Sequence, residues 1–446
     1  MPIEFKSASV DRHDIATRMP FKYGIATMTD VPHVFVTVTV EIDGTASTGR
    51  SADHLPPKWF TKEPDAPVER EIMEMESSIT GAITAAKGIT AADPFAFWME
   101  LYARLMNPPH FPALLQHFGI SLVERAMLDA VCRHYQMPLW KLIHDNRLGI
   151  DLASLSPELS GMQPQDFLPG NPLDSVNLRH TVGMADPLRE VDIPDADRLG
   201  DGLPQSLEAC IREYGLREFK LKLSGQPDAD LQRLRAIAAV VTEHAPADFH
   251  FSLDGNEQFA TPEQLRAFGE QVYADSRLAA FFEHLLFIEQ PINRKVALSP
   301  DAPEVSNAWP RPVPIIIDES DGALEDFPRA LELGYAGVSH KNCKGVFKGL
   351  RNRALIAHHQ AQHPDRKFLM SAEDLANIGP VALLQDLAVQ ALLGNASVER
   401  NGHHYFRGLS MFSEVTSQEI LQHHPNLYHA GPDGLAYLTV DHGTLS

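Results

Sequence analysis

Two lysines, Lys220 and Lys222, stand at alternate positions in an otherwise apolar segment that reads Phe219-Lys-Leu-Lys-Leu223. On a β-strand alternate side chains share a face, so both ammonium groups point the same way and the apolar side chains point the other way. Ammonium groups on such a strand are costly unless carboxylates, a metal ion or an anionic substrate lie opposite them. We therefore expect this strand to supply an amine base.

Three carboxylates, Asp254, Glu289 and Asp318, each follow an apolar run, and each is about one strand–helix unit from the next. If the three converge, they repel one another and must take up protons unless a cation lies between them. A set of oxygen ligands suits Mg²⁺ better than Zn²⁺, which prefers histidine and cysteine. The sequence therefore predicts one Mg²⁺ site at the ends of consecutive strands, with Mn²⁺ as the alternative ion.

Lysines stand on both sides of this carboxylate set in the chain. Lys222 precedes the first carboxylate by one strand–helix unit, and Lys341 ends the strand that follows the last one. A nearby cation lowers the pKa of an amine, which leaves part of each lysine neutral and able to take a proton. The pattern predicts removal of the proton α to a carboxylate, with the metal stabilising the enediolate charge. Lys344, in the turn after the strand, is a competing base, although Lys341 ends the strand directly.

The elements that position these residues begin with an expected α+β domain over residues 1–145. Residues 34–40 alternate as a strand does, and the period becomes helical from about residue 67. Two loops, 19–24 and 51–60, are dense in turn formers, aromatic residues and charges. Loops of this kind often carry specificity.

Residues 146–175 are rich in proline and are expected to be a linker or an insertion. Residues 176–408 then alternate between strand and helix patterns, which predicts the α/β class and a (β/α)8-type barrel capped by the N-terminal α+β domain. Residues 409–446 are expected to return to the capping domain through a strand at 434–440. The strands of the barrel are expected at 178–183, 218–223, 249–254, 285–289, 313–318, 337–341, 367–371 and 397–400.

Composition excludes several classes of partner. The chain has 38 basic and 59 acidic residues, a formal net charge of -21 and no long basic run, which argues against nucleic acid and anionic membrane as partners. Its three cysteines have no paired or metal-ligand spacing, which indicates a reducing compartment. The start lacks the apolar run of a signal peptide and no stretch could span a membrane, so a cytoplasmic protein is expected.

Five motifs occur in order and at suitable spacing, and together they resemble the enolase superfamily. Within it they are similar to the muconate lactonizing enzyme-like subgroup of the mandelate racemase/muconate lactonizing enzyme family, with its Lys-x-Lys motif. The segment 371–373 offers no histidine at the end of the seventh strand, which argues against the His-Asp dyad of mandelate racemase itself. The motifs are Phe219-Lys-Leu-Lys222, Leu253-Asp-Gly-Asn-Glu257, Phe287-Ile-Glu-Gln-Pro291, Ile317-Asp-Glu-Ser320 and the strand that ends at Lys341.

The resemblance implies a role for each matching position. Lys222 would be the base of the Lys-x-Lys pair, Lys220 its electrostatic partner, and Lys341 the base or cationic stabiliser on the opposite face. Small carboxylates would be the substrates and a homo-oligomer the expected assembly. The implied metal ligands are Asp254, Glu289 and Asp318, their neighbours are Asn256 and Glu319, and the candidate substrate contacts are Tyr23, His54, Trp59 and Glu373.

Two departures from the family pattern bear on the substrate. The segment 49–53 lacks the Gly-x-Gly-Glu of many members, and the eighth strand reads Glu399-Arg-Asn-Gly in place of the Asp-x-Asp of dipeptide epimerases, which argues against a substrate ammonium there. Racemisation or epimerisation is the leading hypothesis, because two lysines oppose each other. The alternatives are β-elimination as in acid-sugar dehydratases, cycloisomerisation, and a non-catalytic metal-binding relative.

Structural interpretations stand beside the functional ones. Lysines often protect the edge of a sheet, and aspartates often cap helices. Glu373 is expected either to bind substrate or to pair with a lysine, and His340 to be a packed histidine. A zinc hydrolase on the same barrel lacks histidine ligands at the strand ends.

Overall fold

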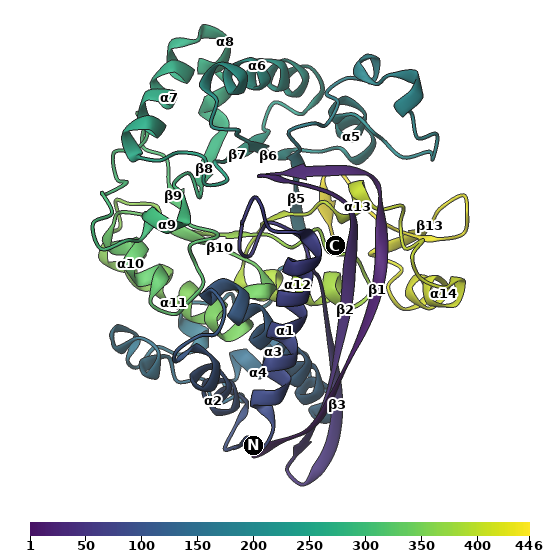
Figure 1. Ribbon diagram of the computed structural model, residues 1–446, viewed down its shortest axis with the longest axis vertical. Helices are drawn as coiled ribbons and strands as arrows, with labels where there is room; N and C mark the ends of the chain where they lie inside the picture. The colour runs from purple at the N-terminus through teal and green to yellow at the C-terminus, as the bar shows by residue number, and fades with distance from the viewer.

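An antiparallel sheet and four helices form the N-terminal part of the chain in the computed structural model, which describes residues 1–446 (Figure 1). The sheet order is β3-β2-β1-β4, so β1, β2 and β3 pair with their neighbours in the chain and β4 pairs with β1. Val34, Val36, Val38 and Val40 are buried on β2, as the alternation predicts. The elements are β1 (Ile3–Tyr23), β2 (Ala26–Ile42), β3 (Thr45–His54), β4 (Thr90–Ala91), α1 (Val68–Ala86), α2 (Pro94–Met106), α3 (Ala113–Tyr135) and α4 (Leu139–His144).

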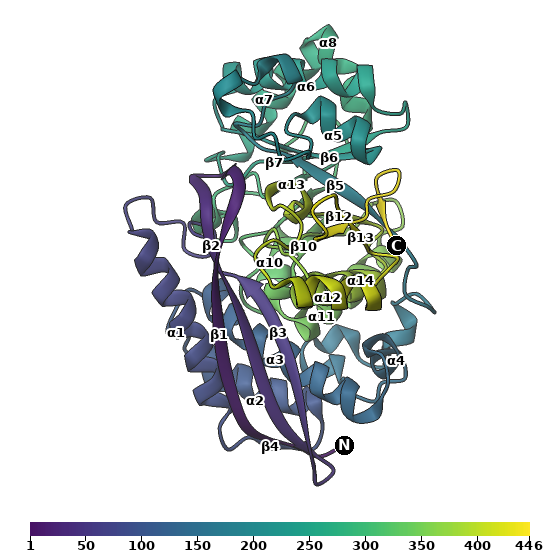
Figure 2. The ribbon, with the colours of Figure 1, turned by 90° about the vertical axis from the view of Figure 1, so that its right-hand side faces the viewer.

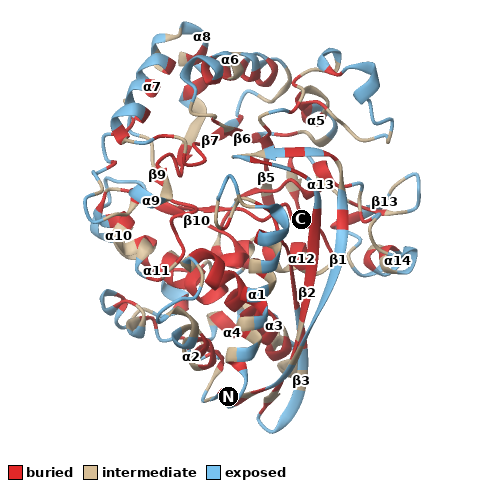
Figure 3. Cartoon of the chain, viewed as in Figure 1, coloured by how far each residue is buried: buried red, intermediate tan, exposed pale blue.

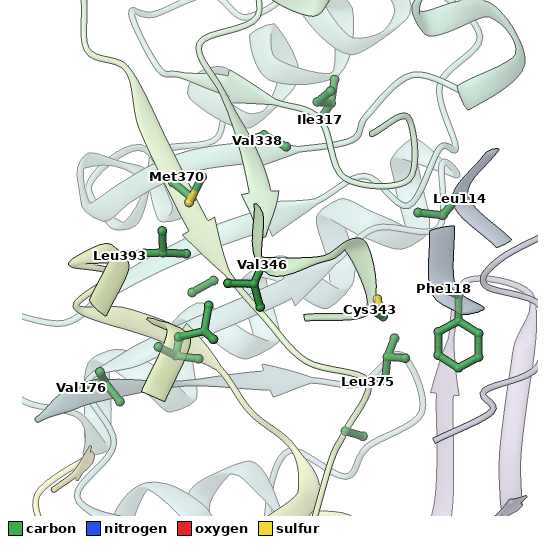
Figure 4. Packing of buried hydrophobic residues seen from close by; sticks show 14 of the residues in the cluster. Leu114, Phe118, Val176, Ile317, Val338, Cys343, Val346, Met370, Leu375 and Leu393 are labelled. Atoms are coloured by element: carbon green, nitrogen blue, oxygen red, sulfur yellow. The ribbon is translucent and has the colours of Figure 1, made fainter. Parts of the chain in front are cut away.

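Helix α3 is buried along most of its length because it lies between the sheet, α1 and the second part of the molecule. Gly49 of β3 allows the close approach of strand and helix, since a Cβ there would lie 2.2 Å from the backbone of Ala126. Figure 4 shows Leu114 and Phe118 of α3 close to Cys343 of the second part. A single cluster of 110 buried apolar residues runs through both parts, so they share one core.

The second part is a barrel of eight parallel strands, as predicted. Its sheet runs β10-β11-β12-β5-β6-β7-β8-β9, and a parallel bridge between Ile317 and Val338 closes the ring between β9 and β10. The strands are β5 (Val176–Val182), β6 (Glu218–Lys222), β7 (His250–Asp254), β8 (Leu285–Glu289), β9 (Ile315–Ile316), β10 (Gly337–His340), β11 (Leu369–Ala372) and β12 (Ser397–Glu399).

Helices surround this ring and bury their inner faces against it, while their outer faces are exposed (Figure 3). None of the helices combines the length and hydrophobicity that a membrane span requires. The helices are α5 (Leu207–Tyr214), α6 (Pro227–His244), α7 (Pro262–Ala274), α8 (Ser276–Ala279), α9 (Arg294–Ala297), α10 (Asp326–Glu332), α11 (Val346–Gln362), α12 (Val381–Leu393) and α13 (Gly402–Tyr405).

Residues 146–175 connect the two parts through three short 3-10 turns, η1 (Leu152–Ser154), η2 (Pro157–Leu159) and η3 (Pro164–Asp166). The segment packs on the molecule: Leu159 is buried, and the Ser156 hydroxyl accepts a hydrogen bond from Nε of Arg351 at 2.8 Å.

The C-terminal segment contains α14 (Glu414–His423), β13 (Tyr428–Ala430), β14 (Ala436–Leu438) and β15 (Thr444–Leu445). The expectation that its strand joins the capping domain is wrong at the level of strand pairing, because β14 pairs with β13 and β15 pairs with β5 of the barrel. The free edge of β3 is already occupied: Asp129 accepts from the Arg50 amide, and Gln385 donates to the Arg50 carbonyl. These two contacts cover the edge of β3 at Arg50.

The hairpin of β1 and β2 extends along the side of the barrel, and its far end lies beside the barrel strands (Figure 2). Arg18, near this end, pairs with Asp201 at 2.7 Å and donates to the carbonyl of His404 at 3.0 Å. The segments 19–24 and 51–60, expected as loops, are partly strand, because β1 extends to Tyr23 and β3 to His54, and both reach the carboxyl ends of the barrel strands.

Candidate active site

The register of the parallel strands brings the predicted strand-end residues together. Lys222 lies opposite Asp254, and Asp254 lies opposite Glu289. Asp318 lies two residues after the end of β9, and Lys341 directly follows β10. Because parallel strands end at one edge of a sheet, regular spacing along the chain becomes proximity in the barrel.

Lys220 lies at the centre of four carboxylates and is only 1 % exposed. Burial alone would lower the pKa of its ammonium group, but the surrounding carboxylates outweigh burial and raise that pKa well above its ordinary value. Lys220 is therefore the counter-ion of the carboxylate set, which is a larger role than the expected tuning of Lys222. Its Nζ lies 3.1 Å from Asp254, 2.9 Å from Glu289, 2.8 Å from Glu373 and 2.9 Å from Glu399.

Lys222 lies nearer the mouth of the barrel and contacts one carboxylate. Its Nζ lies 2.8 Å from Oδ2 of Asp254 and 3.4 Å from Oδ1 of Asn256. Asn256 also donates to Asp254 at 3.1 Å, so it positions both partners. Burial is the largest influence and lowers the pKa of Lys222, but the charges of Asp254 and Glu399 and the hydrogen bond to Asp254 together outweigh it, so the net shift is upward. The expected lowering of this pKa depends on a metal ion bound near the amine, and it stays a prediction.

Lys341 approaches from the other side of the barrel. Its Nζ lies 2.6 Å from Asp318 and 2.7 Å from Glu373, and 4.9 Å from the centre of the Trp59 ring. Strands β6 and β10 are four positions apart in the closed ring of eight, so Lys222 and Lys341 come from opposite walls. For Lys341 too, burial lowers the pKa but neighbouring carboxylates raise it well above its ordinary value.

Lys344, the competing candidate for the base, lies deeper and does not line the pocket. Its Nζ donates to the carboxylate and the carbonyl of Asp318, each at 2.7 Å, and to the carbonyl of Ser339 at 2.8 Å. All three protons of the ammonium group are therefore engaged. The geometry favours Lys341 over Lys344 as the lysine that meets a substrate.

One pocket lies over these residues, and both parts of the chain line it. The barrel supplies lysines and carboxylates, and the capping domain supplies an apolar wall. Tyr23 and Trp59 are part of this wall, as expected for substrate contacts. The pocket is lined by Phe21, Tyr23, Met28, Pro56, Trp59, Lys220, Lys222, Asp254, Asn256, Asp318, Lys341, Glu373, Asp374, Leu375, Ala376, Glu399 and Asn401.

His54 does not lie in this pocket, contrary to the expectation. It is fully buried at the end of β3, with Nδ1 3.1 Å from Nδ1 of His33 and its ring stacked on Phe406. Burial lowers the pKa of His54 to about 3, which keeps the ring neutral. Alternation on the strand turns its side chain into the core.

Glu373 pairs with lysines from both walls, Lys220 and Lys341. This matches the structural interpretation of Glu373, and it leaves the residue at the pocket surface as well. His340 is packed, as expected: its ring lies against Gly349, and burial lowers its pKa to about 3.

The carboxylates fit an Mg²⁺ ion. Glu289 is fully buried, and neither of its carboxylate oxygens has a hydrogen-bond partner, although Lys220 lies near. One oxygen from each of Glu289, Asp318 and Glu373 lies within 4.8 Å of the others, and Asp254 stands on the adjacent strand. Unpartnered buried carboxylate oxygens are costly, and a set of oxygen donors is the type that Mg²⁺ prefers. The donor set includes Glu373, which the sequence suggested as a substrate contact or as the partner of a lysine.

Glu319 is buried beside this set, and its Oε2 has no hydrogen-bond partner. Burial, and after it the charges of Asp318 and Glu257, raises the pKa of Glu319 to about 7. Asn256 and Glu319 thus both lie next to the proposed ligands, but only Asn256 lines the pocket.

The loop that carries Trp59 is tied to the barrel by residues with no sequence signal. Arg294 donates to the carbonyls of Trp59 and Phe60, each at 2.9 Å, and to Glu257 at 2.7 Å. Lys62 also reaches Glu257, at 2.7 Å. These partners are far apart in the chain, and only the fold brings them together.

Comparisons with known proteins support the architecture. A sequence-family model described as "Enolase C-terminal domain-like" matches residues 203–430, and no curated protein matches the chain. Among solved structures, a dipeptide epimerase from Enterococcus faecalis, complexed with Mg and a dipeptide, has a TM-score of 0.61 at 16% identity and covers 99% of this chain and 100% of its own.

Two further structures are similar over most of their length. An N-succinyl Arg/Lys racemase from Bacillus cereus has a TM-score of 0.59 at 16% identity, covering 99% of this chain and 96% of its own. The muconate lactonizing enzyme of Pseudomonas fluorescens has a TM-score of 0.58 at 19% identity, covering 88% of this chain and 87% of its own.

Proposed function

Because the chain belongs to the enolase C-terminal domain-like family, we propose that it is an isomerase that removes the α-proton of a small carboxylate substrate and returns it, as a racemase or epimerase. Epimerases, racemases and a cycloisomerase share its fold. The proposal also depends on the arrangement of this chain's own side chains.

The observation that carries the proposal is the opposition of two lysines across one pocket. Lys222 and Lys341 both line the pocket, and their strands lie on opposite walls of the barrel. A substrate α-carbon held between them presents one face to each lysine. The lysine in its neutral form takes the α-proton, and the ammonium group on the other face delivers a proton to the same carbon. Reversal of these roles catalyses the opposite direction.

We propose that Asp254, Glu289 and Asp318 hold one Mg²⁺ ion, with Glu373 as a further oxygen donor. When bound, this ion stabilises the negative charge that develops on the substrate carboxylate during proton removal. Lys220 lies beneath the proposed metal site, where it balances the excess negative charge of the four carboxylates around it.

The pocket favours an anionic substrate with an apolar part. Glu399, at the eighth strand end, pairs with Lys220 and accepts from Thr181, so it is not free to bind a substrate ammonium. Asp374 is likewise paired, with Arg400 at 2.6 Å. The apolar wall from the capping domain suits an acyl or aromatic group. We therefore propose carboxylates without a free ammonium group, such as N-acyl amino acids and hydroxy acids.

Proton exchange in D₂O tests this function. The full chain with Mg²⁺ is incubated with both stereoisomers of each member of an acid panel, and α-deuterium incorporation is followed by NMR. Lys222→Ala and Lys341→Ala should each lower racemisation by at least about 10²-fold. Each variant should still exchange the α-proton of one stereoisomer, the one that faces the remaining lysine.

The control is Lys295→Ala, an exposed lysine on α9, which should exchange and racemise at the wild-type rate. Full exchange of both stereoisomers in both single variants would sink the two-lysine proposal. A third outcome is loss of a β-substituent, with the substrate consumed or deuterated and no opposite stereoisomer formed. That result would show that the reaction is elimination and not racemisation. Turnover of no acid in the panel, with Mg²⁺ still bound, would favour a non-catalytic relative.

A further inference from the structure

A second group of possible metal ligands lies on the outer side of the barrel wall. His180 of β5, Cys210 of α5 and His404 of α13 each place one donor atom within 4.8 Å of the others. Thr181, the next residue of β5, points into the barrel and reaches Glu399, so His180 points outward toward the helices. Three elements that are distant in sequence therefore each place one possible ligand in the same small volume.

The spacing of these donors suits a tetrahedral metal ion. The Cys210 sulfur lies 3.5 Å from Nδ1 of His404, and the rings of His180 and His404 are 5.0 Å apart between centres. With metal–sulfur bonds of about 2.3 Å and metal–nitrogen bonds of about 2.0 Å, tetrahedral ligands lie roughly 3.3–3.6 Å from one another. The distance from the Cys210 sulfur to Nδ1 of His404 already lies in this range, without any movement of the side chains.

The ligand set is buried and only partly satisfied. His180, Cys210 and His404 are each at most 2 % exposed. Nδ1 of His180 has no hydrogen-bond partner, and an unpartnered buried ring nitrogen is costly. Burial keeps the His180 ring neutral by lowering its pKa to about 4, and a neutral imidazole is the form that binds metal ions.

A compensating negative charge is present beside the group. Asp186 is largely buried and accepts a hydrogen bond from the Tyr405 hydroxyl at 2.8 Å. Burial, and after it the charge of Asp186, raises the pKa of the Cys210 thiol, so this carboxylate acts directly on the sulfur. A divalent ion with one thiolate and two neutral imidazoles carries one positive charge, and Asp186 balances it.

The group is separate from the candidate active site. None of the three residues lines the active-site pocket. A different surface pocket is lined by Tyr214, Gly402 and His403, and the His403 ring is 5.6 Å from that of His180. The His403 ring thus stands between this pocket and His180.

We propose that His180, Cys210 and His404 form a second metal site, which binds one Zn²⁺ ion through two imidazole nitrogens and one thiolate. These are the ligands of borderline and soft transition ions, in contrast to the carboxylates at the strand ends. On binding, the thiol gives its proton to solvent, so one metal ion enters and about one proton leaves. The ion would fasten α5 and α13 to the barrel wall, and three protein ligands leave a fourth coordination position open.

Cobalt titration tests the second site. The full chain is stripped with a chelator, supplied with excess Mg²⁺ to fill the carboxylate site, and titrated with Co²⁺. We expect a near-ultraviolet thiolate-to-cobalt charge-transfer band that saturates at about one Co²⁺ per chain and disappears when Zn²⁺ is added. Oxygen ligands produce no such band, so the active site does not contribute to it.

Matched cysteine variants locate the signal. Cys210→Ser should abolish the band, whereas Cys132→Ser and Cys343→Ser should retain it. His404→Gln provides a second disruption if Cys210→Ser does not fold, and Zn²⁺ should raise the melting temperature of wild type more than that of either variant. Absence of the band in folded wild-type protein with excess Co²⁺ would overturn the proposal, as would a band that persists in folded Cys210→Ser.

Discussion

Lys220 shows how a single buried charge organises the candidate site. It is enclosed by four carboxylates, and no other ammonium group of the site contacts as many. Removal of one partner from a buried ion network is more damaging than replacement of the whole network, because the remaining charges stay buried without compensation. The residue therefore matters for folding as well as for chemistry.

We predict that Lys220→Met lowers the free energy of unfolding by about 3–5 kcal/mol when the protein is free of divalent ions. Added Mg²⁺ should restore part of this loss, since it supplies positive charge to the same carboxylates. Urea unfolding with a chelator and with Mg²⁺ measures both effects. Lys222→Met is the control, because Lys222 contacts one carboxylate; an equal loss in the two variants would contradict the role of Lys220.

At the scale of residues, the sequence is a good guide to residues that stand at the ends of strands. It is a poor guide to residues whose role depends on how deeply the side chain is buried. Asp254, Glu289 and Lys341 were identifiable because strand ends share an edge. The exclusion of His54 from the pocket was not identifiable, since both faces of β3 are buried near its end. The pairing of Glu373 with two lysines likewise depends on how far side chains extend across the barrel, and the spacing of residues in the sequence does not give this distance.

At the scale of elements, two glycines of the helices in the capping domain have opposite surroundings: one is tightly packed and the other faces open space. A Cβ on Gly119 of α3 would lie 2.2 Å from the Ser78 carbonyl of α1, whereas a Cβ on Gly81 of α1 would meet nothing within 4 Å. The helices therefore approach each other closely at Gly119, whereas Gly81 faces open space.

We predict that Gly119→Ala lowers the free energy of unfolding by about 1–3 kcal/mol, because backbone must move to accept the methyl group. Gly81→Ala should raise it by about 0.5–1 kcal/mol, because alanine favours the helix. Both changes carry the same propensity gain, so their difference measures the steric effect. Chemical denaturation of the two variants checks it, and stabilisation by Gly119→Ala would contradict the close approach.

The positions of strands were predicted more reliably than the strands with which they pair. The period of apolar residues indicated every barrel strand and the strand at 34–40 of the N-terminal sheet. The partner of the 434–440 strand was predicted incorrectly, because side chains such as Gln385 had already taken the edge of β3. A hydrophobic period reports which side of a strand is buried, and it does not report which neighbouring edges are free.

At the scale of the whole molecule, Arg294 joins the capping domain to the barrel above the candidate active site. It donates to two carbonyls of the Trp59 loop and pairs with Glu257. Because Trp59 forms part of the pocket wall, this contact couples the position of the domain to the shape of the pocket.

We predict that Arg294→Met speeds amide hydrogen exchange in residues 56–62 and raises KM for the substrate by about 3–10-fold. Hydrogen–deuterium exchange and steady-state kinetics measure the two effects. Arg266→Met is the matched control, because Arg266 pairs with Glu270 and does not contact the capping domain. Equal exchange of the loop in both variants would show that Arg294 does not hold it.

The closure of the barrel also determines when the molecule can fold. Strand β12 completes the ring by lying beside β5, with Val398 opposite Leu178. Nearly the whole barrel sequence separates these two residues, so loop closure costs entropy before their contacts compensate for it. The N-terminal sheet pairs strands that are neighbours in the chain and can form early during synthesis. The time of greatest aggregation risk therefore falls between the folding of that sheet and the arrival of β12, while β5 still presents an unpaired edge.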